Sequence, residues 1–423
     1  MLVDFVKIAP SGPIDSVVRP PGSKSITNRA LICSVLAAGP SVLRGALKSD
    51  DTEVMISSLR ALGFEVEPDW DQALIRVQGQ AGSIPANQAV MDLKNSGTSI
   101  RFLTALCAVG QGCFTLDGVQ RMRQRPIGDL VSALNQLGGD VRCVGGCPPV
   151  EINARGLVGG ATKVAGEMSS QFLSALLMVL PQMQKFTVLQ VAGALVSQPY
   201  VSMTCQVMSQ FGVDVTQMAG EYSIDPRHAY VGQDYEIEPD ASAASYFWAA
   251  AAITGGRCHV EGLKLGAVQG DTRFLQLLEE MGCEIIADET GTAIYGGPLK
   301  GIEADMNDIS DTVQTLAAVA LFAEGPTTIK GVAHNRFKET DRIGNLAIEL
   351  RKLGADVEET QDGMVITPGP LRGVEIETYD DHRMAMALSL VGLRQEGVVI
   401  RDPNCVSKTY PGFWEDLKAV TES

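Results

Sequence analysis

The stretch LRALGFEV at residues 59–66 carries the pattern that decides the fold, because four similar stretches follow it along the chain. Apolar residues three apart followed by a glycine indicate the end of a helix with a left-handed C-cap, and the apolar residues after the glycine begin a strand. The similar stretches are LNQLGGDV (134–141), MSQFGVDV (208–215), LEEMGCEI (278–285) and LRKLGADV (350–357). The glycines of the five copies recur every 70 to 75 residues, at Gly63, Gly138, Gly212, Gly282 and Gly354. A fixed period of this length indicates one structural unit repeated along the chain.

A second helical segment recurs with the same period, in six copies. Each copy opens with hydroxyl or carboxylate residues suited to an N-cap and continues as a helix that is apolar on most sides. The copies are SITNRALICSVLAAG (25–39), SGTSIRFLTALCAVG (96–110), SSQFLSALLMVLPQ (169–182), ASAASYFWAAAAITGG (241–256), SDTVQTLAAVALFAEG (310–325) and DDHRMAMALSLVGLRQEG (380–397). A helix with so little polar surface is expected to be buried.

The two recurring elements predict an α+β fold of six units that fill the 423 residues. Buried helices need cover on every side, so several units are expected to pack around one core. Three units per domain fit the usual domain size and give two domains of about 200 residues each. The break is expected near VGQDYEIEPDAS, residues 231–242. A solenoid is the competing architecture, and the apolar character of the helices argues against it.

The composition excludes several functional classes. The net charge of −16 argues against nucleic acid or an anionic membrane as the partner. The longest apolar runs are too short to span a bilayer, and the N-terminus lacks the order of a secretory signal, so we expect a cytoplasmic protein. The nine cysteines include no C-x-x-C spacing and the chain has only four histidines, which favours reduced structural thiols over a zinc site or a disulfide framework.

The conspicuous polar residues gather at the starts of the six apolar helices. Helix starts offer unpaired N–H groups and a partial positive charge, which suit anions. These residues are Lys24, Ser25 and Arg29; Asn95, Gly97, Thr98 and Arg101; Ser169, Ser170 and Gln171; Asp240 and Ser242; Asp311; Asp381, His382 and Arg383, with further cations in loops at Arg123, Arg125, Lys338, Arg342 and Lys408. A local excess of cations in an acidic chain predicts a small anionic substrate. The spacing of a P-loop and that of a dinucleotide fingerprint are both missing from the sequence.

The motifs identify a family. The chain contains PGSKSITNRA (21–30), KNSGTSIRFL (94–103), RMRQRPIGDL (121–130), SSQFLSALL (169–177), SQPYV (197–201), KETDRI (338–343), DDHRMAMALSL (380–390) and SKTYPGF (407–413). In this order and spacing they strongly resemble the 5-enolpyruvylshikimate-3-phosphate synthase family of the shikimate pathway, which supplies aromatic amino acids. The resemblance implies two domains of three βαβαββ-like units each, an inside-out α/β barrel, with the active site in the cleft between them. It assigns residues 1–20 and 237–423 to one domain and 21–236 to the other, with a hinge near 20–21 and 236–239.

The resemblance also implies the reaction. The enolpyruvyl group of phosphoenolpyruvate is transferred to the 5-hydroxyl of shikimate 3-phosphate, and phosphate leaves a tetrahedral intermediate. Both substrates are anions, which explains the local cations. No metal or organic cofactor is expected. The family is usually monomeric, and glyphosate inhibits it at the phosphoenolpyruvate site.

Site residues follow from the resemblance, motif by motif. Asp311 is implied as the base at the hydroxyl and Glu339 as the acid that protonates the methylene carbon, with Lys24 also in the catalytic set. Two roles remain open for His382: it acts as a second proton shuttle, or it is a structural partner of Asp381. The implied phosphoenolpyruvate ligands are Lys24, Gly97, Arg125, Gln171, Arg342, Arg383 and Lys408. The implied shikimate 3-phosphate ligands are Lys24, Ser25, Arg29, Ser169, Ser170, Gln171, Ser197, Tyr200, Asp311, Asn335 and Lys338.

Two positions depart from the usual family pattern, and two other functions compete. Lys94 and Phe102 are unusual for the family and adjoin Gly97, so they bear on glyphosate binding, although the intact Gly97 favours sensitivity. The sister transferase acting on UDP-N-acetylglucosamine relies on a cysteine in one loop. In this chain the corresponding loop reads VQRMRQRPIGDL (119–130) and contains no cysteine, which argues against that function. A non-catalytic anion-binding relative would be expected to lack Asp311, Glu339 or Lys408, and all three are present.

Overall fold

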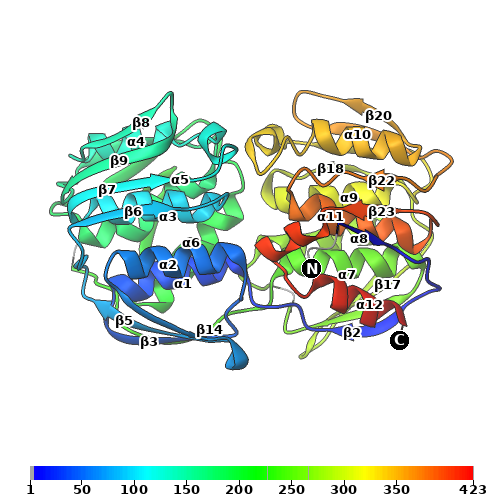
Figure 1. The fold of residues 1–423 in the computed structure, drawn as a ribbon, viewed down its shortest axis with the longest axis horizontal. Coiled ribbons are helices and arrows are strands. Elements are labelled where there is room, and N and C mark those ends of the chain that lie inside the picture. The colour runs from blue at the N-terminus through cyan, green and yellow to red at the C-terminus, as the bar shows by residue number, and fades with distance from the viewer. Residues whose placement is uncertain (1–3, 226, 265, 423) are drawn as a thin grey trace. The chain divides into compact units, whose positions relative to one another are not determined.

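The computed structural model describes residues 4–225, 227–264 and 266–422. The chain folds into two compact units (Figure 1). The continuous unit comprises Gly22–Ile237, and the split unit combines Met1–Pro21 with Glu238–Ser423. Each unit is built from three sheets and two sets of helices.

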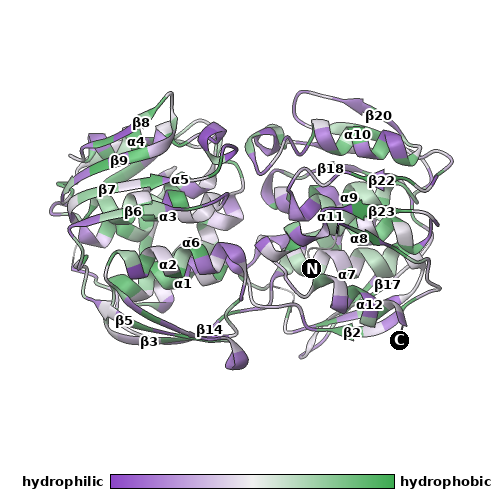
Figure 2. Cartoon of the chain, viewed as in Figure 1, coloured by the Kyte–Doolittle hydropathy of each residue, from purple (hydrophilic) through white to green (hydrophobic). Residues whose placement is uncertain are grey.

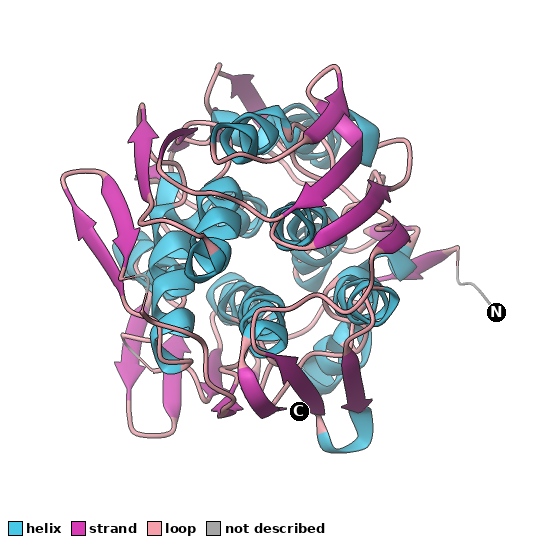
Figure 3. Cartoon of the chain, turned by 90° about the vertical axis from the view of Figure 1, so that its left-hand side faces the viewer, coloured by secondary structure: helices cyan, strands magenta, loops and turns pink. Residues whose placement is uncertain are grey.

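Six inner helices fill the interiors, three in each unit. In Figure 3, helices occupy the interior and strands lie on the outside, and in Figure 2 the inner helices carry much of the hydrophobic colour. All fourteen residues of α7 are buried, as its apolar sequence predicts. The inner helices are α1 (Lys24–Leu36), α3 (Gly97–Ala108) and α5 (Ser170–Val179) in the continuous unit, and α7 (Ala241–Thr254), α9 (Val313–Ala320) and α11 (His382–Ser389) in the split unit.

The N-caps of the inner helices match the expected residue types, with one shift in position. All six N-caps are Ser, Thr or Asp, and four of them accept a backbone N–H: Ser23, Ser169, Asp240 and Asp381. The helix expected to open at residues 310–311 instead begins at Val313, and its N-cap Thr312 makes no side-chain capping bond. Asp311 therefore does not cap this helix and lies one residue earlier in the 3₁₀ helix η5 (Asn307–Thr312).

A second set of six helices contains the five that end at the recurring glycines. These are α2 (Asp50–Ala61), α4 (Gly128–Gln136), α6 (Gln198–Gln210), α8 (Phe274–Met281) and α10 (Gly344–Leu353), and the sixth is α12 (Phe413–Glu422). All five glycines have positive φ, which confirms the predicted left-handed C-caps. At Gly354 a Cβ would also lie 2.3 Å from the carbonyl oxygen of Pro370. Only glycine fits this turn.

The sheets repeat one topology. In each four-stranded sheet the first strand is parallel to the second, and the other pairs are antiparallel. The continuous unit contains β14–β3–β5–β4, β6–β7–β9–β8 and β10–β11–β13–β12, and the split unit contains β2–β15–β17–β16, β18–β19–β21–β20 and β1–β23–β22. This confirms the βαβαββ-like repeat. Because the continuous unit is the middle of the chain and the split unit takes segments from either side of it, the chain passes twice between the units, after Pro21 and after Ile237.

The strands of the two units are short, and most have three to seven residues. In the continuous unit they are β3 (Ala38–Arg44), β4 (Glu65–Asp69), β5 (Leu74–Gln80), β6 (Gln88–Asp92), β7 (Gln111–Asp117), β8 (Val141–Val144), β9 (Cys147–Arg155), β10 (Ala161–Ala165), β11 (Val188–Ala192), β12 (Val215–Met218), β13 (Glu221–Ile224) and β14 (Asp234–Glu236). In the split unit they are β1 (Phe5–Lys7), β2 (Asp15–Val18), β15 (Arg257–Glu261), β16 (Glu284–Ala287), β17 (Gly291–Tyr295), β18 (Glu303–Asp305), β19 (Thr327–Lys330), β20 (Asp356–Glu359), β21 (Met364–Thr367), β22 (Glu375–Ile376) and β23 (Val399–Arg401). Within the described ranges, every helix falls short of the length and hydropathy that crossing a bilayer requires.

Candidate active site

Arg342 organises the charged residues of the split unit. It precedes α10, and its buried guanidinium contacts three carboxylates: Glu339 at 2.8 Å, Asp311 at 3.2 Å and Asp381 at 2.7 Å. Burial alone would lower the pKa of Arg342, but Asp381, Glu339 and Asp311 together raise it above its ordinary value. The residue therefore stays charged and holds three carboxylates from separate segments in one cluster. Such a fork also suits bidentate binding of a carboxylate or phosphate.

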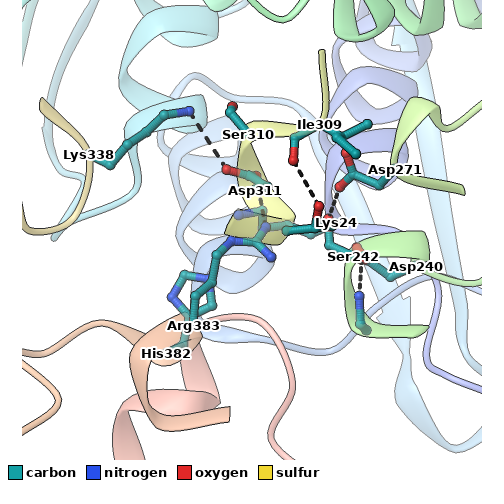
Figure 4. A network of polar contacts seen from close by, with 12 residues as sticks. Lys24, Asp240, Ser242, Asp271, Ile309, Ser310, Asp311, Lys338, His382 and Arg383 are labelled. Atoms are coloured by element: carbon teal, nitrogen blue, oxygen red, sulfur yellow. Dashed lines mark hydrogen bonds and ion pairs between the residues drawn. The ribbon is translucent and has the colours of Figure 1, made fainter. Parts of the chain in front are cut away.

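The carboxylate of Asp311 forms ion pairs with three cationic side chains. In addition to Arg342, its carboxylate accepts Nη2 of Arg383 at 2.8 Å and lies 3.7 Å from Nζ of Lys338 (Figure 4). A break in helical geometry at Ile309, with φ −127° and ψ 38°, lies two residues before Asp311. The side chain is 17% exposed, so the carboxylate is both fixed in orientation and accessible. This combination suits a base that acts on a bound hydroxyl group.

The first turn of α11 brings the next three predicted residues together. Asp381 caps the helix by accepting the backbone N–H of Arg383 at 2.9 Å and also accepts two bonds from Arg342. His382 is 1% exposed, and its Nδ1 lies 3.6 Å from Oδ1 of Asp381. This burial and contact favour the structural alternative for His382.

The remaining predicted residues of the split unit lie in loops and 3₁₀ turns. Asn335 is buried, donates its amide to the carbonyl of Ser310 at 2.9 Å and accepts the backbone N–H of Arg342 at 3.2 Å. It thus connects the segment of Asp311 to that of Arg342. Lys338 is partly exposed, and Lys408 ends the 3₁₀ helix η8 (Pro403–Lys408) with 9% of its surface exposed.

In the continuous unit, Gln171 at the start of α5 is held from α3. Arg101 donates to the side-chain oxygen of Gln171 at 2.7 Å, and the amide of Gln171 lies 3.3 Å from Oγ1 of Thr98. Arg101 is itself fixed by the carbonyl oxygens of Gly97 and Pro126 and stacks over the ring of Phe172. The first turns of α3 and α5 therefore lie together, as the anion-site hypothesis requires.

Gly97 and Arg125 form a close contact in the same region. Arg125 is 3% exposed and donates to the carbonyl and side-chain oxygens of Asn95 at 3.0 and 3.3 Å. A Cβ at position 97 would lie 2.4 Å from Nη2 of Arg125 and 2.8 Å from Nη1 of Arg101. The missing side chain at Gly97 therefore makes room for two arginines of this unit.

Arg29 is 1% exposed, and its guanidinium is held by protein groups of α1 and α6. It bonds to Oγ1 of Thr204 at 2.7 Å and to the carbonyl oxygens of Ser25 at 2.9 Å and Tyr200 at 3.1 Å. The ring of Phe102 lies 5.2 Å from it. The observed role of Arg29 is therefore to join α1 to α6 and to fix the backbone at Ser25 and Tyr200.

The predicted serines of the continuous unit also mark helix starts. Ser169 accepts the backbone N–H of Gln171 at 3.2 Å, and Ser170 is the first residue of α5. Ser197 precedes α6 with a left-handed φ of 52°. Lys24 opens α1, and its Nζ lies 3.4 Å from Asp51. Ser25 follows in the same turn of α1 and is partly buried.

Sequence reasoning missed several residues of these clusters. Asp51, which pairs with Lys24, had no motif of its own. Arg101 was among the polar residues at helix starts, but its role in positioning Gln171 was not predicted. Asp381 was assigned no role beyond its contact with His382, yet it bonds Arg342 at two points. Its position at the N-cap of an apolar helix was the available signal.

Comparison with known proteins decides the family. The model of the EPSP synthase (3-phosphoshikimate 1-carboxyvinyltransferase) family matches residues 8–417. The chain belongs to this family. The 3-phosphoshikimate 1-carboxyvinyltransferase of Nostoc punctiforme is 47% identical over 97% of this chain and 98% of its own. The chloroplastic enzyme of that name from Arabidopsis thaliana is 43% identical, with 99% of this chain and 84% of its own aligned.

Solved structures agree with this family assignment. An EPSP synthase from Acinetobacter baumannii superposes with a TM-score of 0.81 at 26% identity, covering 98% of each chain. The enolpyruvyl transferase NikO from Streptomyces tendae superposes with a TM-score of 0.78 at 19% identity, which shows a shared fold. The EPSP synthase fold of repeated mixed sheets around buried helices is therefore the fold of this chain.

Proposed function

We propose how this chain carries out the reaction of the EPSP synthase family. As a member it is a transferase that moves the enolpyruvyl group of phosphoenolpyruvate to the 5-hydroxyl of shikimate 3-phosphate and releases phosphate. The observation that carries the proposal is the cluster in which one buried arginine, Arg342, contacts Asp311 and Glu339 at 3.2 and 2.8 Å. Two carboxylates on one cation meet the need for one base and one acid close together.

The proton transfers assign a role to each carboxylate. Asp311 removes the proton of the 5-hydroxyl as its oxygen bonds to C2 of phosphoenolpyruvate. Glu339 donates a proton to C3, so that the methylene becomes a methyl group in the tetrahedral intermediate. Loss of a proton from this methyl group back to Glu339, with departure of phosphate from C2, regenerates the double bond, and the leaving phosphate takes up the proton that Asp311 removed from the hydroxyl. Lys24 is proposed to stabilise the charge on the phosphate group.

The predicted ligands are assigned to the two substrates, and Lys24 and Gln171 are assigned to both. Phosphoenolpyruvate is proposed to bind Lys24, Arg125, Gln171, Arg342, Arg383 and Lys408 near Gly97. Shikimate 3-phosphate is proposed to bind Lys24, Ser25, Arg29, Ser169, Ser170, Gln171, Ser197, Tyr200, Asp311, Asn335 and Lys338. These residues belong to both units of the chain. Arginine forks and helix-start amides support this assignment to anions.

Phosphate release tests the function with two acceptors. We expect release from phosphoenolpyruvate with shikimate 3-phosphate and none with UDP-N-acetylglucosamine. Release with the nucleotide sugar alone would instead identify the sister transferase. Release with neither acceptor would support the non-catalytic binding protein.

Glyphosate is proposed to inhibit at the phosphoenolpyruvate site. Of the two unusual residues, Lys94 is exposed and pairs with Asp92, and Phe102 is buried against Arg29. Neither contact disturbs Gly97 or Arg125, which supports inhibition.

Replacement of Gly97 by alanine should weaken the binding of both phosphoenolpyruvate and glyphosate. The added Cβ must displace Arg125, so the KM for phosphoenolpyruvate is expected to rise about tenfold, the cost of one weakened charged contact. The glyphosate inhibition constant should rise more. Steady-state kinetics measures both, with Gly12→Ala as the control because nothing lies within 4 Å of a Cβ there. An unchanged KM would show that Arg125 does not bind phosphoenolpyruvate.

The state and location of the protein complete the proposal. We propose a monomer of 45.0 kDa, which light scattering checks directly. All nine cysteines are free, which supports a reducing, cytoplasmic location.

A further inference from the structure

A buried carboxylate outside the proposed catalytic set lies beside that set. Asp271 is 3% exposed and belongs to the 3₁₀ helix η4 (Gly270–Arg273), which precedes α8. Its Oδ2 accepts a hydrogen bond from the hydroxyl of Ser242, in the first turn of α7 (Figure 4). Both η4 and η5 pack on α7, and they contact each other, so the segment of Asp271 lies against the segment of Asp311.

The charges around Asp271 come from each element packed against it. Asp311 of η5 and Asp240 at the start of α7 are like charges, whereas Arg383 of α11 is opposite. On its own element, Arg273 is half exposed and pairs with Asp308 at 2.9 Å. Burial first, and then Asp311, raises the pKa of Asp271 to about 6, while Ser242 and Arg383 counteract the rise.

We propose that Asp271 is a positioning residue for the reaction: it is a buried carboxylate that Ser242 holds in a segment packed against that of Asp311, and its charge acts on the proposed base. The inference rests on the proposed role of Asp311 as the base. A stronger base is a better acceptor for the hydroxyl proton as long as it remains ionised at the working pH. Asp271 itself contacts no substrate in this account and acts only through Asp311.

The Asp271→Asn variant tests this directly. Loss of the neighbouring negative charge should lower the pKa of Asp311, so the acidic limb of the kcat against pH profile should move to lower pH. The plateau of kcat should fall about three- to tenfold, as for a weaker general base, with KM values within about twofold. Because the folded state raises the pKa of Asp271, its ionisation opposes folding above about pH 6, and the variant should be at least as stable as the parent at about pH 7.5.

The Ser242→Ala variant separates charge from packing. Without the hydroxyl, Asp271 should stay protonated to a higher pH, so kcat should fall near about pH 6.5 and return to the parent value near about pH 8.5. A purely structural loss would lower kcat equally at all pH values and would overturn the proposal. Asp308→Asn is the matched control, because this carboxylate is on the element of Asp311 but is exposed.

Asp311→Asn in the same assay distinguishes a failure of the proposed role of Asp311 from a failure of the proposed role of Asp271. If it retains parental kcat, the proposed function of Asp311 fails. If it loses activity while Asp271→Asn keeps the parental profile, the inference on Asp271 fails alone. A shifted limb in Asp271→Asn together with inactive Asp311→Asn supports both.

Discussion

Replacement of Asp311 by asparagine is expected to lower kcat by about three orders of magnitude, within the range of general base catalysis. The amide keeps the size of the carboxylate and leaves Arg342, Arg383 and Lys338 in place, but it cannot accept the hydroxyl proton. The KM values should change little, because the cations proposed to bind the substrates remain. Steady-state kinetics with both substrates varied separates the two constants.

The control for this variant is again Asp308→Asn, which is on the same 3₁₀ helix and should retain parental kcat. A kcat of Asp311→Asn within about tenfold of the parent would contradict the assignment of Asp311 as the base. A large rise in KM with unchanged kcat would instead make Asp311 a binding residue.

Replacement of Arg342 by methionine should have the largest effect on stability. The change leaves Asp311, Glu339 and Asp381 without their shared cation, and Asp381 is fully buried. Removing one partner of a buried ion pair lowers the free energy of unfolding by about 3–5 kcal/mol, because the other charge stays buried without compensation. Urea unfolding monitored by tryptophan fluorescence measures it, since Trp248 and Trp414 are both in the split unit.

Arg401→Met provides the matched control. Arg401 also contacts two carboxylates, Glu375 and Glu377, but its side chain is 53% exposed. Exposed ion pairs contribute about 0–1 kcal/mol, so the control should unfold close to the parent. Equal effects of the two variants would show that the cluster around Arg342 is not a buried network.

The repeat was predictable because its signals are local. A glycine after an apolar helix end needs only its own φ, and all five glycines could be found from the residues around them. The apolar helices were equally clear, because a buried helix has few polar positions wherever it lies. The pairing of β2 with β15 and of β14 with β3 could not be read in this way, because it joins segments about 190 to 240 residues apart.

The candidate site was predictable where motifs fix chemistry and less so where tertiary contacts do. Arg29 carries the same motif signal as Lys24, yet only the structure shows that Thr204 and Tyr200 already hold its guanidinium. The helix expected to open at residues 310–311 begins at Val313, because the 3₁₀ helix η5 precedes it. Asp271 was missed because its segment packs against that of Asp311 only in the folded chain, which no spacing in the sequence reveals.

Deuterium incorporation from solvent shows whether Glu339 protonates the methylene carbon, while Asp311 removes the proton of the 5-hydroxyl. With phosphoenolpyruvate and shikimate 3-phosphate in D₂O, the parent should place deuterium in the methylene groups of product and residual phosphoenolpyruvate, as mass spectrometry detects. Glu339→Gln should lose this exchange together with turnover. Parental exchange in Glu339→Gln would contradict this assignment, because another group would then be the acid.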